Sequence, residues 1–598
     1  MVRNACRYLF YVILLLFIII MSCAKVNTPS GGPKDKMPPV VVKSVPENGT
    51  RNFTGNRIVV TFDEYVALDK ISEKFMVSPP MAKKPVVTIK GKNIIIEYED
   101  ILHDSTTYTF YFQDAVRDLN EGNILNNYQF VFSTGSVIDS LSVTGNVYNA
   151  FTLDPPENTV LLLYRDLDLS SVTKNLPDYI SKADQNGYFR IDNVREGRYL
   201  LYALKDADNS KNFNLPDEEF AFLDSPVEIT SEKNYSPVRP DTVKTKQGNT
   251  VVPDTAVRKG EYKLILFKPE KKQRYLTSSS RDLLPYHLVY TLSMPPDSMD
   301  FSFSIPGTDD KSYFIEKSRE KDTIQIWLTD SILYSQQDIT TLVRYPFTDT
   351  TGIVFQKEDT VLMRFLVPRA TRARPKPVPL KVTPSLMGGT LKPGQNIVFR
   401  SLTPLLDPDT SKIRLYETDG KIRKKIPFSF LRDPNNSCRI TMTARYEQGK
   451  NYLFITDSTA FSNLYGDKSD STGIRFSAGK IQDYGKLILN ITGFEGKRII
   501  QILDNSEKVL QQAVMQKNGK TEFPLLDKGS YKLRVIYDLN GDSKWTTGDY
   551  MTRRQPEPVS FYSREFEISA NFEITQDWNI GEMNVRKLKN IAKKSNIR

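Results

Sequence analysis

Oxygen-bearing side chains alternate along residues 538–549, which read DLNGDSKWTTGD. With Asp538 counted as position 1, positions 3, 5, 7, 9 and 12 are Asn540, Asp542, Lys544, Thr546 and Asp549. A twelve-residue calcium loop takes its oxygen ligands from these positions, and position 7 contributes its main-chain carbonyl. The spacing therefore predicts a structural calcium ion. A cage of about seven oxygens leaves no open position for a substrate, so we expect the ion to order the loop.

Two features depart from the calcium-loop pattern. Position 6 is Ser543, where a glycine usually makes the sharp turn, and the preceding run 531–537 is typical of a strand instead of a helix. The alternative is a hairpin loop held by Asx turns, in which Asp and Asn side chains accept hydrogen bonds from nearby N–H groups. The Asp-x-Asn-x-Asp order, with an Asp at position 12, resembles the calcium loop of dockerin modules. That resemblance implies the same set of ligands.

A second loop with related spacing lies far upstream. Its corresponding positions are Asp206, Asp208, Ser210, Asn212, Asn214 and Asp217. In both copies a Gly-x-Tyr opens an apolar run, an Asp follows the Tyr seven residues later, and another Asp follows eleven residues after that. The shared spacing predicts a duplicated β unit and a second candidate calcium loop.

Other residues suited to catalysis are scarce. The two histidines, His103 and His287, fall in different predicted domains, and Cys438 lies in a strand-like run distant from both. No Walker loop, zinc-type Cys pair or His-Glu-x-x-His motif occurs. Carboxylate pairs such as Asp63-Glu64 have the residue types of a glycosidase, but acids are common at strand edges. We therefore expect no enzymatic activity and no cofactor other than calcium.

The N-terminus has the pattern of an export signal. Residues 1–22 combine Arg3 and Arg7 with an apolar run shorter than the roughly 20 residues of a membrane span, although an anchor helix is the alternative. The sequence Ile-Met-Ser-Cys23 resembles the lipobox of bacterial lipoproteins, which implies acylation of Cys23. The mature chain then keeps only Cys438 as a free thiol, so no internal disulfide is expected.

Composition predicts several β domains. A length of 598 residues corresponds to about four or five domains, and 30 Tyr with 32 Phe favour strands. The net charge is +10, and removal of the two arginines of the signal leaves +8. Basic residues cluster only at 369–376 and 586–598, as expected for a solvated linker and tail, or for contact with anionic lipid. Nucleic acid is not an expected partner.

The first domain follows a tether at residues 23–37 and spans 38–135. Its short β-branched and aromatic runs predict a sandwich. Residues 46–49 (PENG), 58–64 (IVVTFDE) and 132–135 (FSTG) resemble the S-layer-type bacterial Ig-like domain. The opening GGPKD with Pro38 and Pro39 resembles Bacteroidetes-type outer-membrane lipoproteins. The resemblance implies a non-enzymatic module.

Residues 138–230 form the second predicted domain. A strand after Asn186-Gly187, and Gly197-x-Tyr199 opening the next, resemble the transthyretin-like or carboxypeptidase-regulatory β-sandwich. We expect a linker at 231–259, a middle β domain without a family match at 260–366, and a Pro- and Arg-rich linker at 367–379.

The C-terminal part repeats the first two domains. In residues 380–479 the interval from Tyr452 to the final Gly479 is the same as that from Tyr108 to Gly135. Residues 480–587 repeat the second domain, and 588–598 form a basic tail. The predicted fold class is all-β, with tandem Ig-like and transthyretin-like β-sandwich domains.

These patterns favour a non-enzymatic cell-envelope lipoprotein that acts as a scaffold or adaptor at the outer membrane. Ala24 is not the Asp that retains lipoproteins in the inner membrane of enteric bacteria, so the resemblance favours the outer membrane. Expected partners are the membrane, through the lipid, and other envelope proteins. The alternatives are a surface glycan- or peptide-binding lipoprotein and an accessory subunit of an assembly or secretion machine. The sequence leaves open which face of the membrane the protein occupies.

Overall fold

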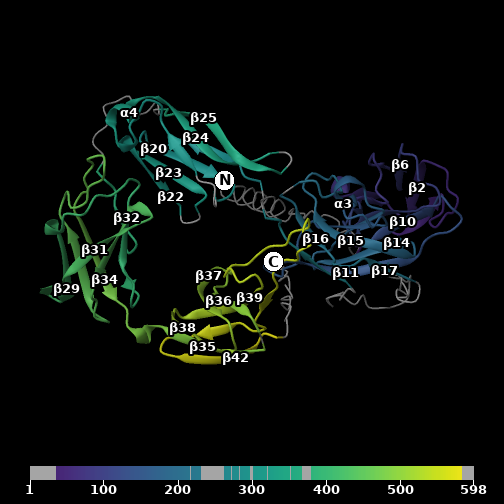
Figure 1. The fold of residues 1–598 in the computed structure, drawn as a ribbon. Coiled ribbons are helices and arrows are strands. Elements are labelled where there is room, and N and C mark those ends of the chain that lie inside the picture. Colours follow the sequence, from purple (N-terminus) through teal and green to yellow (C-terminus); the bar gives the residue numbers. More distant parts are fainter. Residues whose placement is uncertain are drawn as a thin grey trace, which may run out of the picture.

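The computed structural model describes residues 35–215, 217–230, 262–270, 273–281, 283–296, 301–318, 321–349, 352–366, 379–493 and 495–581. Strands make up nearly all of the regular structure in these ranges, and the predicted all-β class is confirmed. The short helices are α2 (Ile71–Lys74), α3 (Ser171–Lys174), α4 (Ser331–Ser335), η1 (Asp310–Ser312), η3 (Thr410–Lys412) and η4 (Ile481–Asp483). Five β-sandwich modules follow one another along the described chain (Figure 1).

The first module is a sandwich with sheets β1-β2-β6-β5 and β10-β7-β4, and a small sheet β3-β8-β9. Its strands are β1 (Val41–Val45), β2 (Arg57–Phe62), β3 (Val66–Leu68), β4 (Met76–Ser78), β5 (Val86–Lys90), β6 (Asn93–Glu97), β7 (Thr107–Gln113), β8 (Val116–Asp118), β9 (Ile124–Leu125) and β10 (Tyr128–Ser133). Alternate residues of β2 point inward, so Ile58, Val60 and Phe62 pack in the core against Phe110 and Phe130. Period-two patterning therefore builds this core.

The second module pairs the sheet β14-β11-β18 with the sheet β13-β12-β15-β16, and β17 adds to β15. Its strands are β11 (Leu141–Asn149), β12 (Val160–Tyr164), β13 (Tyr179–Lys182), β14 (Tyr188–Val194), β15 (Gly197–Lys205), β16 (Glu219–Phe222), β17 (Val227–Ile229) and β18 (Tyr262–Leu266). β18 lies parallel to β11, with Gly145 opposite Tyr262. The expected boundary assigned these residues to the middle domain, whereas the sheet joins them to the second. A parallel partner needs a long connection, so local sequence could not reveal it.

The fifth module has the same strand order. Its sheets are β38-β35-β42 and β37-β36-β39-β40, β41 adds to β39, and β42 lies parallel to β35. Its strands are β35 (Gly485–Thr492), β36 (Lys497–Leu503), β37 (Val509–Met515), β38 (Gly519–Leu526), β39 (Gly529–Asp538), β40 (Val559–Phe561), β41 (Phe566–Ile568) and β42 (Glu573–Asn579). Eight strands in one order, with the last strand parallel in both, give structural support to duplication.

The second and fifth modules share a hydrogen bond made by equivalent tyrosines. The Tyr199 hydroxyl donates to the carbonyl of Arg195 at 2.9 Å, and the Tyr531 hydroxyl donates to the carbonyl of Asp527 at 2.6 Å. In each module the bond spans four residues and ties the start of the central strand to the turn before it. The Gly-x-Tyr motif therefore fixes a turn as well as opening a strand.

The third module consists of the sheets β19-β20-β23-β22 and β21-β24-β25. Its strands are β19 (Leu276–Ser280), β20 (His287–Leu292), β21 (Ser302–Ser304), β22 (Tyr313–Lys317), β23 (Thr323–Leu328), β24 (Asp338–Thr348) and β25 (Val354–Arg364). Arg281 is 1% exposed and donates to the carbonyls of Tyr334, Pro285 and Gln336 at 2.7 to 3.0 Å. Main-chain acceptors thus satisfy this buried cation, which joins α4 to the sheet.

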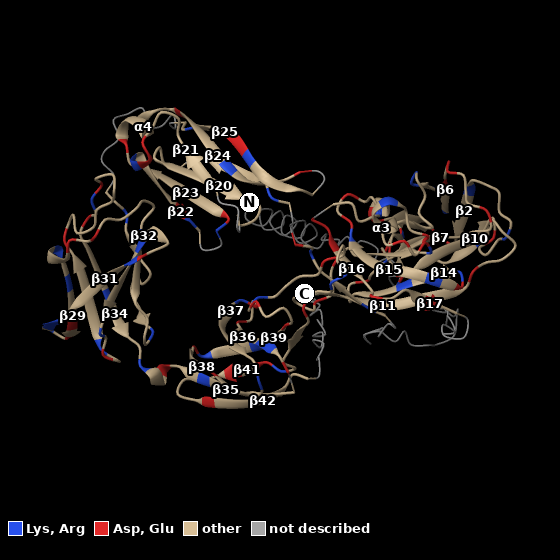
Figure 2. Ribbon diagram, viewed as in Figure 1, with Lys and Arg blue, Asp and Glu red and all other residues tan. Residues whose placement is uncertain are grey.

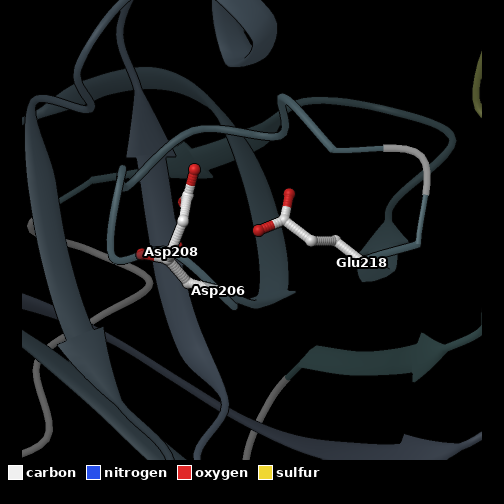
Figure 3. A group of neighbouring side chains, drawn as sticks. All are labelled: Asp206, Asp208 and Glu218. Carbon is white, nitrogen blue, oxygen red and sulfur yellow. The ribbon is translucent and has the colours of Figure 1, made fainter.

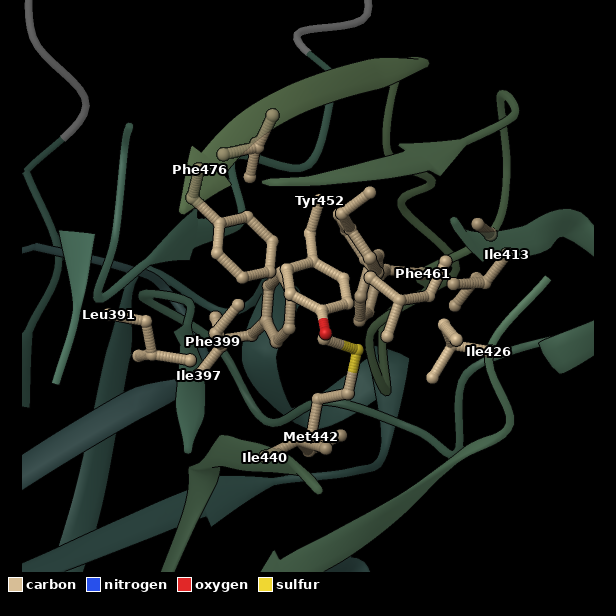
Figure 4. Packing of buried hydrophobic residues seen from close by; sticks show 14 of the residues in the cluster. Leu391, Ile397, Phe399, Ile413, Ile426, Ile440, Met442, Tyr452, Phe461 and Phe476 are labelled. Carbon is tan, nitrogen blue, oxygen red and sulfur yellow. The ribbon is translucent and has the colours of Figure 1, made fainter. Parts of the chain in front are cut away.

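The fourth module consists of the sheets β26-β28-β32-β31 and β27-β34-β33-β29-β30. Its strands are β26 (Thr383–Pro384), β27 (Thr390–Leu391), β28 (Ile397–Arg400), β29 (Ile413–Asp419), β30 (Ile422–Lys425), β31 (Phe428–Asp433), β32 (Asn436–Ala444), β33 (Asn451–Thr456) and β34 (Thr472–Ala478). Tyr452 stacks on Phe476 in its core at 5.4 Å (Figure 4), as Tyr108 stacks on Phe132 in the first module at 5.5 Å. Each tyrosine hydroxyl also accepts from the N–H five residues earlier.

The modules form a closed circuit, because the fifth module returns to the second (Figure 1). Tyr550 packs in the same apolar cluster as Phe220 and Phe222 of the second module. Its hydroxyl donates to the carbonyl of Leu169 at 2.6 Å and accepts from the Tyr202 hydroxyl at 2.8 Å. Figure 2 shows charges of both signs interspersed over the modules in this view.

Candidate metal loops

The first candidate loop connects β15 to β16 and brings three carboxylates together (Figure 3). One oxygen from each of Asp206, Asp208 and Glu218 lies within 4.8 Å of the others. The sequence spacing predicted Asp206 and Asp208 as ligands, but it predicted Asp217 as the last ligand in place of Glu218. Asp217 instead lies 3.3 Å from the ammonium of Lys268, so the carboxylate that completes the group is one residue further along the chain.

Glu218 is buried and bonds to main-chain N–H groups at both ends of the loop. It is 2% exposed, and its two carboxylate oxygens accept from the main-chain N–H groups of Ala207 at 3.0 Å and Leu215 at 3.2 Å. Burial of an ionised carboxylate is costly unless N–H groups or a cation compensate. Counted from Asp206, Glu218 is position 13, so the twelve-residue spacing of a calcium loop does not include it.

Asp206 and Asp208 arrange the turn that precedes Glu218. Asp206 accepts from the N–H groups of Ser210 and Lys211, both at 3.0 Å, and Asp208 accepts from the Asn214 amide at 3.0 Å. Hydrogen bonds from Asn214 and Ser210 lower the pKa of Asp208 to about 2. Burial raises the pKa of Asp206, and the neighbouring charge of Asp208 raises it further. A cation beside Asp206 and Asp208 would offset both the burial of Asp206 and the repulsion between the two carboxylates.

The remaining predicted positions of the first loop supply amide and hydroxyl oxygens. The side-chain oxygen of Asn212 is buried and has no hydrogen-bond partner within the described chain, and that of Asn214 lies 3.1 Å from the Ser210 hydroxyl. Carboxylate and amide oxygens are the ligands that Ca²⁺ prefers. The chemistry of this donor set and the orphaned Asn212 oxygen fit a calcium ion.

The second candidate loop, between β39 and β40, repeats this main-chain conformation. Gly541 and Ser543 have φ values of 80° and 65°, and the equivalent Asn209 and Lys211 of the first loop both have 61°. Asp538 accepts from the N–H of Gly541 at 2.7 Å and of Ser543 at 2.9 Å. Ser543 therefore adopts the left-handed conformation that favours glycine, and its presence at position 6 does not prevent the turn.

A buried glutamate again lies at the centre of the second loop. Glu557, 5% exposed, accepts from the N–H groups of Leu539 at 2.6 Å and Thr546 at 2.9 Å. Twelve residues separate Asp206 from Glu218, whereas 19 separate Asp538 from Glu557. The second loop is thus seven residues longer. Because of this extra length, the spacing of a calcium loop could not predict Glu557.

The other predicted ligands of the second loop bond mainly to one another. Asn540 donates to the Thr546 hydroxyl at 2.7 Å, and Asp542 accepts from the main-chain N–H of Lys544 at 2.7 Å. Asp549 accepts instead from the Met551 N–H and the Thr552 hydroxyl, at 3.1 and 2.8 Å. Asx turns thus hold this loop, as the alternative interpretation expected, and Asp549 belongs to the segment that docks Tyr550.

A lysine supplies a positive charge to the second loop. The ammonium of Lys497, at the start of β36, lies 3.5 Å from a carboxylate oxygen of Asp538 and donates to the carbonyl of Gly541 at 2.6 Å. Strand register places Asn158 at the equivalent position of the second module, because Ile499 opposite Ile536 corresponds to Val160 opposite Leu204. The second loop carries its own cation, so its residues do not fit calcium.

The remaining reactive residue types are separated. His287 stacks on Trp327 at 3.9 Å and pairs with Gln325 at 3.1 Å. Burial raises the pKa of the Cys438 thiol to about 12, which disfavours the thiolate. His103 is exposed in the first module. Cys23, the predicted lipidation site, lies outside the described residues, as do most of the two predicted linkers and the tail.

No helix in the described part of the chain is long and apolar enough to cross a membrane. Residues 35–134 match the family described as bacterial Ig-like domain. The first module is thus a bacterial Ig-like domain, as the sequence predicted. The described part of the chain consists of five β-sandwich modules.

Solved structures give distant similarities. An α-2-macroglobulin fragment from Escherichia coli is 14% identical, covers 44% of this chain and 93% of its own, and has a TM-score of 0.19. The glucan-utilisation-locus protein SGBP-B of Bacteroides ovatus is 10% identical over 72% of this chain and 94% of its own, with a TM-score of 0.16. The S-layer protein rSbsC is 11% identical over 83% and 64%, with a TM-score of 0.13. No curated protein matches the chain. Such low scores support no argument about function.

Proposed function

We propose that this chain is a non-enzymatic scaffold or adaptor of the cell envelope, anchored to the outer membrane through a lipid on Cys23. The observation that supports a scaffold best is the closed circuit of modules. The fifth module covers the second with Tyr550, and the guanidinium of Arg534 lies 3.9 Å from the centre of the Phe151 ring. A closed arrangement restricts the independent motion that linkers would otherwise permit, and so can hold bound components at fixed separations.

The contact between the second and fifth modules also contains hydrogen bonds from side chains of the fifth module to main-chain carbonyls of the second. Arg553 donates to the carbonyl of Leu223 at 2.7 Å, and Gln555 donates to the carbonyl of Phe222 at 3.0 Å. The Arg553 guanidinium lies 4.3 Å from the Phe222 ring centre. Aromatic and arginine residues of this kind dominate the energy of protein interfaces. The contact therefore has the chemistry of a stable interface.

A structural calcium ion in the first loop is part of the proposal. Asp206, Asp208 and Glu218 would hold it, with the Asn212 oxygen as a further ligand. The ion would neutralise carboxylates that have no Lys or Arg ion-pair partner among the described residues. In the second loop Lys497 takes this role.

Recovery of the protein from detergent-solubilised membranes tests the proposed function. A scaffold or adaptor should copurify with envelope proteins at fixed stoichiometry, and Cys23→Ala should abolish membrane association without changing the fold of the modules. Recovery with an outer-membrane barrel would identify an accessory subunit of a machine. Recovery of a glycan or peptide alone would support a surface binding protein. Hydrolytic turnover that is lost on changing one acidic pair would overturn the non-enzymatic proposal.

A further inference from the structure

A pocket of about 350 Å³ lies where the first and second modules meet. Ligand pockets measure roughly 300 to 1,000 Å³ and are frequent at domain interfaces. The modules are fixed to each other beside it, because the buried Ser78 hydroxyl accepts from the N–H of Ile180 at 3.0 Å. Met76 of the first module packs in the apolar cluster of the second. The walls are therefore held together by contacts that do not involve a ligand.

Apolar residues from both modules form part of the pocket wall. Phe75, Val77 and Met81 of the first module and Ile180 of the second line the pocket. Each of these residues is less than a tenth exposed, so their side chains are held by packing. An apolar chain placed against them would gain about 25 cal/mol for each Å² removed from water.

Lysines from both modules also line the pocket: Lys84 of the first, and Lys182 and Lys211 of the second. None of the three forms an ion pair with a described residue. The ammonium of Lys84 donates to the carbonyl of Ser72, which leaves its charge uncompensated. Burial lowers the pKa of Lys84, and the charge of Lys211 lowers it further. Like charges are thus brought together beside apolar walls.

Two acidic residues, Glu73 and Asp206, also line the pocket, but neither forms an ion pair with one of the three lysines. Both carboxylate oxygens of Asp206 accept main-chain N–H groups in the candidate calcium loop. Glu73 is exposed and forms no ion pair with a described residue. The lining thus has one more positive than negative charge, and Asp206 is occupied by its own loop.

We propose that this pocket binds a small anionic amphiphile, with its apolar chain against Phe75, Met81 and Ile180 and its anionic head between Lys84 and Lys211. An anionic head would offset the repulsion between the two ammonium groups, whereas a cationic head would add to it. A neutral head would supply no negative charge to offset the two ammonium groups. Carboxylate and phosphate heads share this chemistry. The site is independent of the proposed scaffold role.

Titration calorimetry on the full chain tests the pocket, with octanoate, octyl phosphate, octanol and octylamine as probes. At least one of the two anions should bind at one molecule per chain, and the stronger of them identifies the head group. Octanol should bind at least about tenfold more weakly, because it makes no charge-assisted bond. Octylamine should not bind. Equal binding of octanol and both anions, or no binding of either anion, would overturn the proposal.

Charge-removing variants locate the binding. Lys84→Gln and Lys211→Gln should each weaken the anion about tenfold, the effect of one lost charge-assisted hydrogen bond. Lys83→Gln is the matched control, because its exposed ammonium pairs with Glu99 at 2.8 Å and does not line the pocket. Unchanged circular dichroism would show that all three variants are folded. Anion affinity that is the same in Lys84→Gln, Lys211→Gln and the wild type would place the ligand elsewhere and overturn the site.

Discussion

Single buried charges determine what each candidate loop can do. Glu218 and Glu557 both accept main-chain N–H groups from their own loops, and each is almost fully buried. The residue that lies opposite the first Asp of each loop differs between the modules. It is Asn158 in the second module and Lys497 in the fifth. The ammonium of Lys497 already compensates the carboxylate of Asp538, whereas Asp206 has no Lys or Arg ion-pair partner among the described residues. One side chain thus separates a loop that fits a metal from one that does not.

His287 provides a pH-dependent prediction at the same scale. Burial against Trp327 lowers its pKa below the ordinary value near 6.5. Below pH 6.5 the unfolded chain therefore binds a proton that the folded module disfavours, and stability falls as the pH falls. We expect the midpoint of thermal unfolding of the third module to decrease from pH 7.5 to pH 5.0, and to decrease less in His287→Gln.

Calorimetry at the two pH values measures this difference. His103→Gln, which removes the exposed histidine of another module, is the control and should retain the wild-type decrease of the third-module transition. An identical pH response in His287→Gln and the wild type would contradict the assignment to His287.

At the scale of elements, the second and fifth modules share one strand order, but their β15–β16 and β39–β40 loops differ in length. In the second module the β15–β16 loop returns directly to its sheet, whereas seven additional residues in the β39–β40 loop carry Tyr550 to a neighbouring module. The turn at the start of each loop is unchanged, because the same positions keep positive φ. Duplication thus preserved the turn and changed the use of the loop.

The two loops allow an internal comparison of calcium binding. Calcium should stabilise the second module, by about 2.7 kcal/mol at 100 times the dissociation constant. Asp208→Asn should remove the response to calcium, and the same type of substitution in the other loop, Asp542→Asn, should leave it intact. Thermal unfolding with calcium or with a chelator measures the effect. No difference between calcium and chelator in the wild type, or equal losses in both variants, would contradict a site in the first loop.

At the scale of the whole molecule, closure depends on the contact between the second and fifth modules, which are distant in sequence. Tyr550 is 5% exposed, and its hydroxyl bonds to both Tyr202 and Leu169. Truncation of a buried aromatic anchor in an interface typically costs 2 kcal/mol or more. Tyr550→Ala should therefore weaken closure and increase the radius of gyration measured by X-ray scattering.

Met551→Ala is the control for closure, because Met551 is adjacent in sequence but 81% exposed. It should leave the scattering curve unchanged. An unchanged radius of gyration in Tyr550→Ala would mean that the remaining contacts, such as Arg534 on Phe151, are sufficient to hold the circuit closed. That result would contradict the assignment of closure to Tyr550.

The sequence by itself determined the features that repeat locally. Alternation of apolar residues predicted strands, and Gly-x-Tyr with its fixed spacing to Asp206 and Asp538 predicted the repeated loops. These features depend on residues close together in the chain, where side-chain period and turn preference act directly.

Tertiary structure alone decided the features that join distant residues. It placed β18 beside β11, brought Glu557 to the N–H of Leu539 and Lys497 to Asp538, and inserted Tyr550 into the apolar cluster of the second module. Loop length between such partners changes at little free-energy cost, so spacing carries little information about them. Burial then selects the partners, because a carboxylate or an aromatic ring removed from water must be compensated by whatever group the fold places beside it.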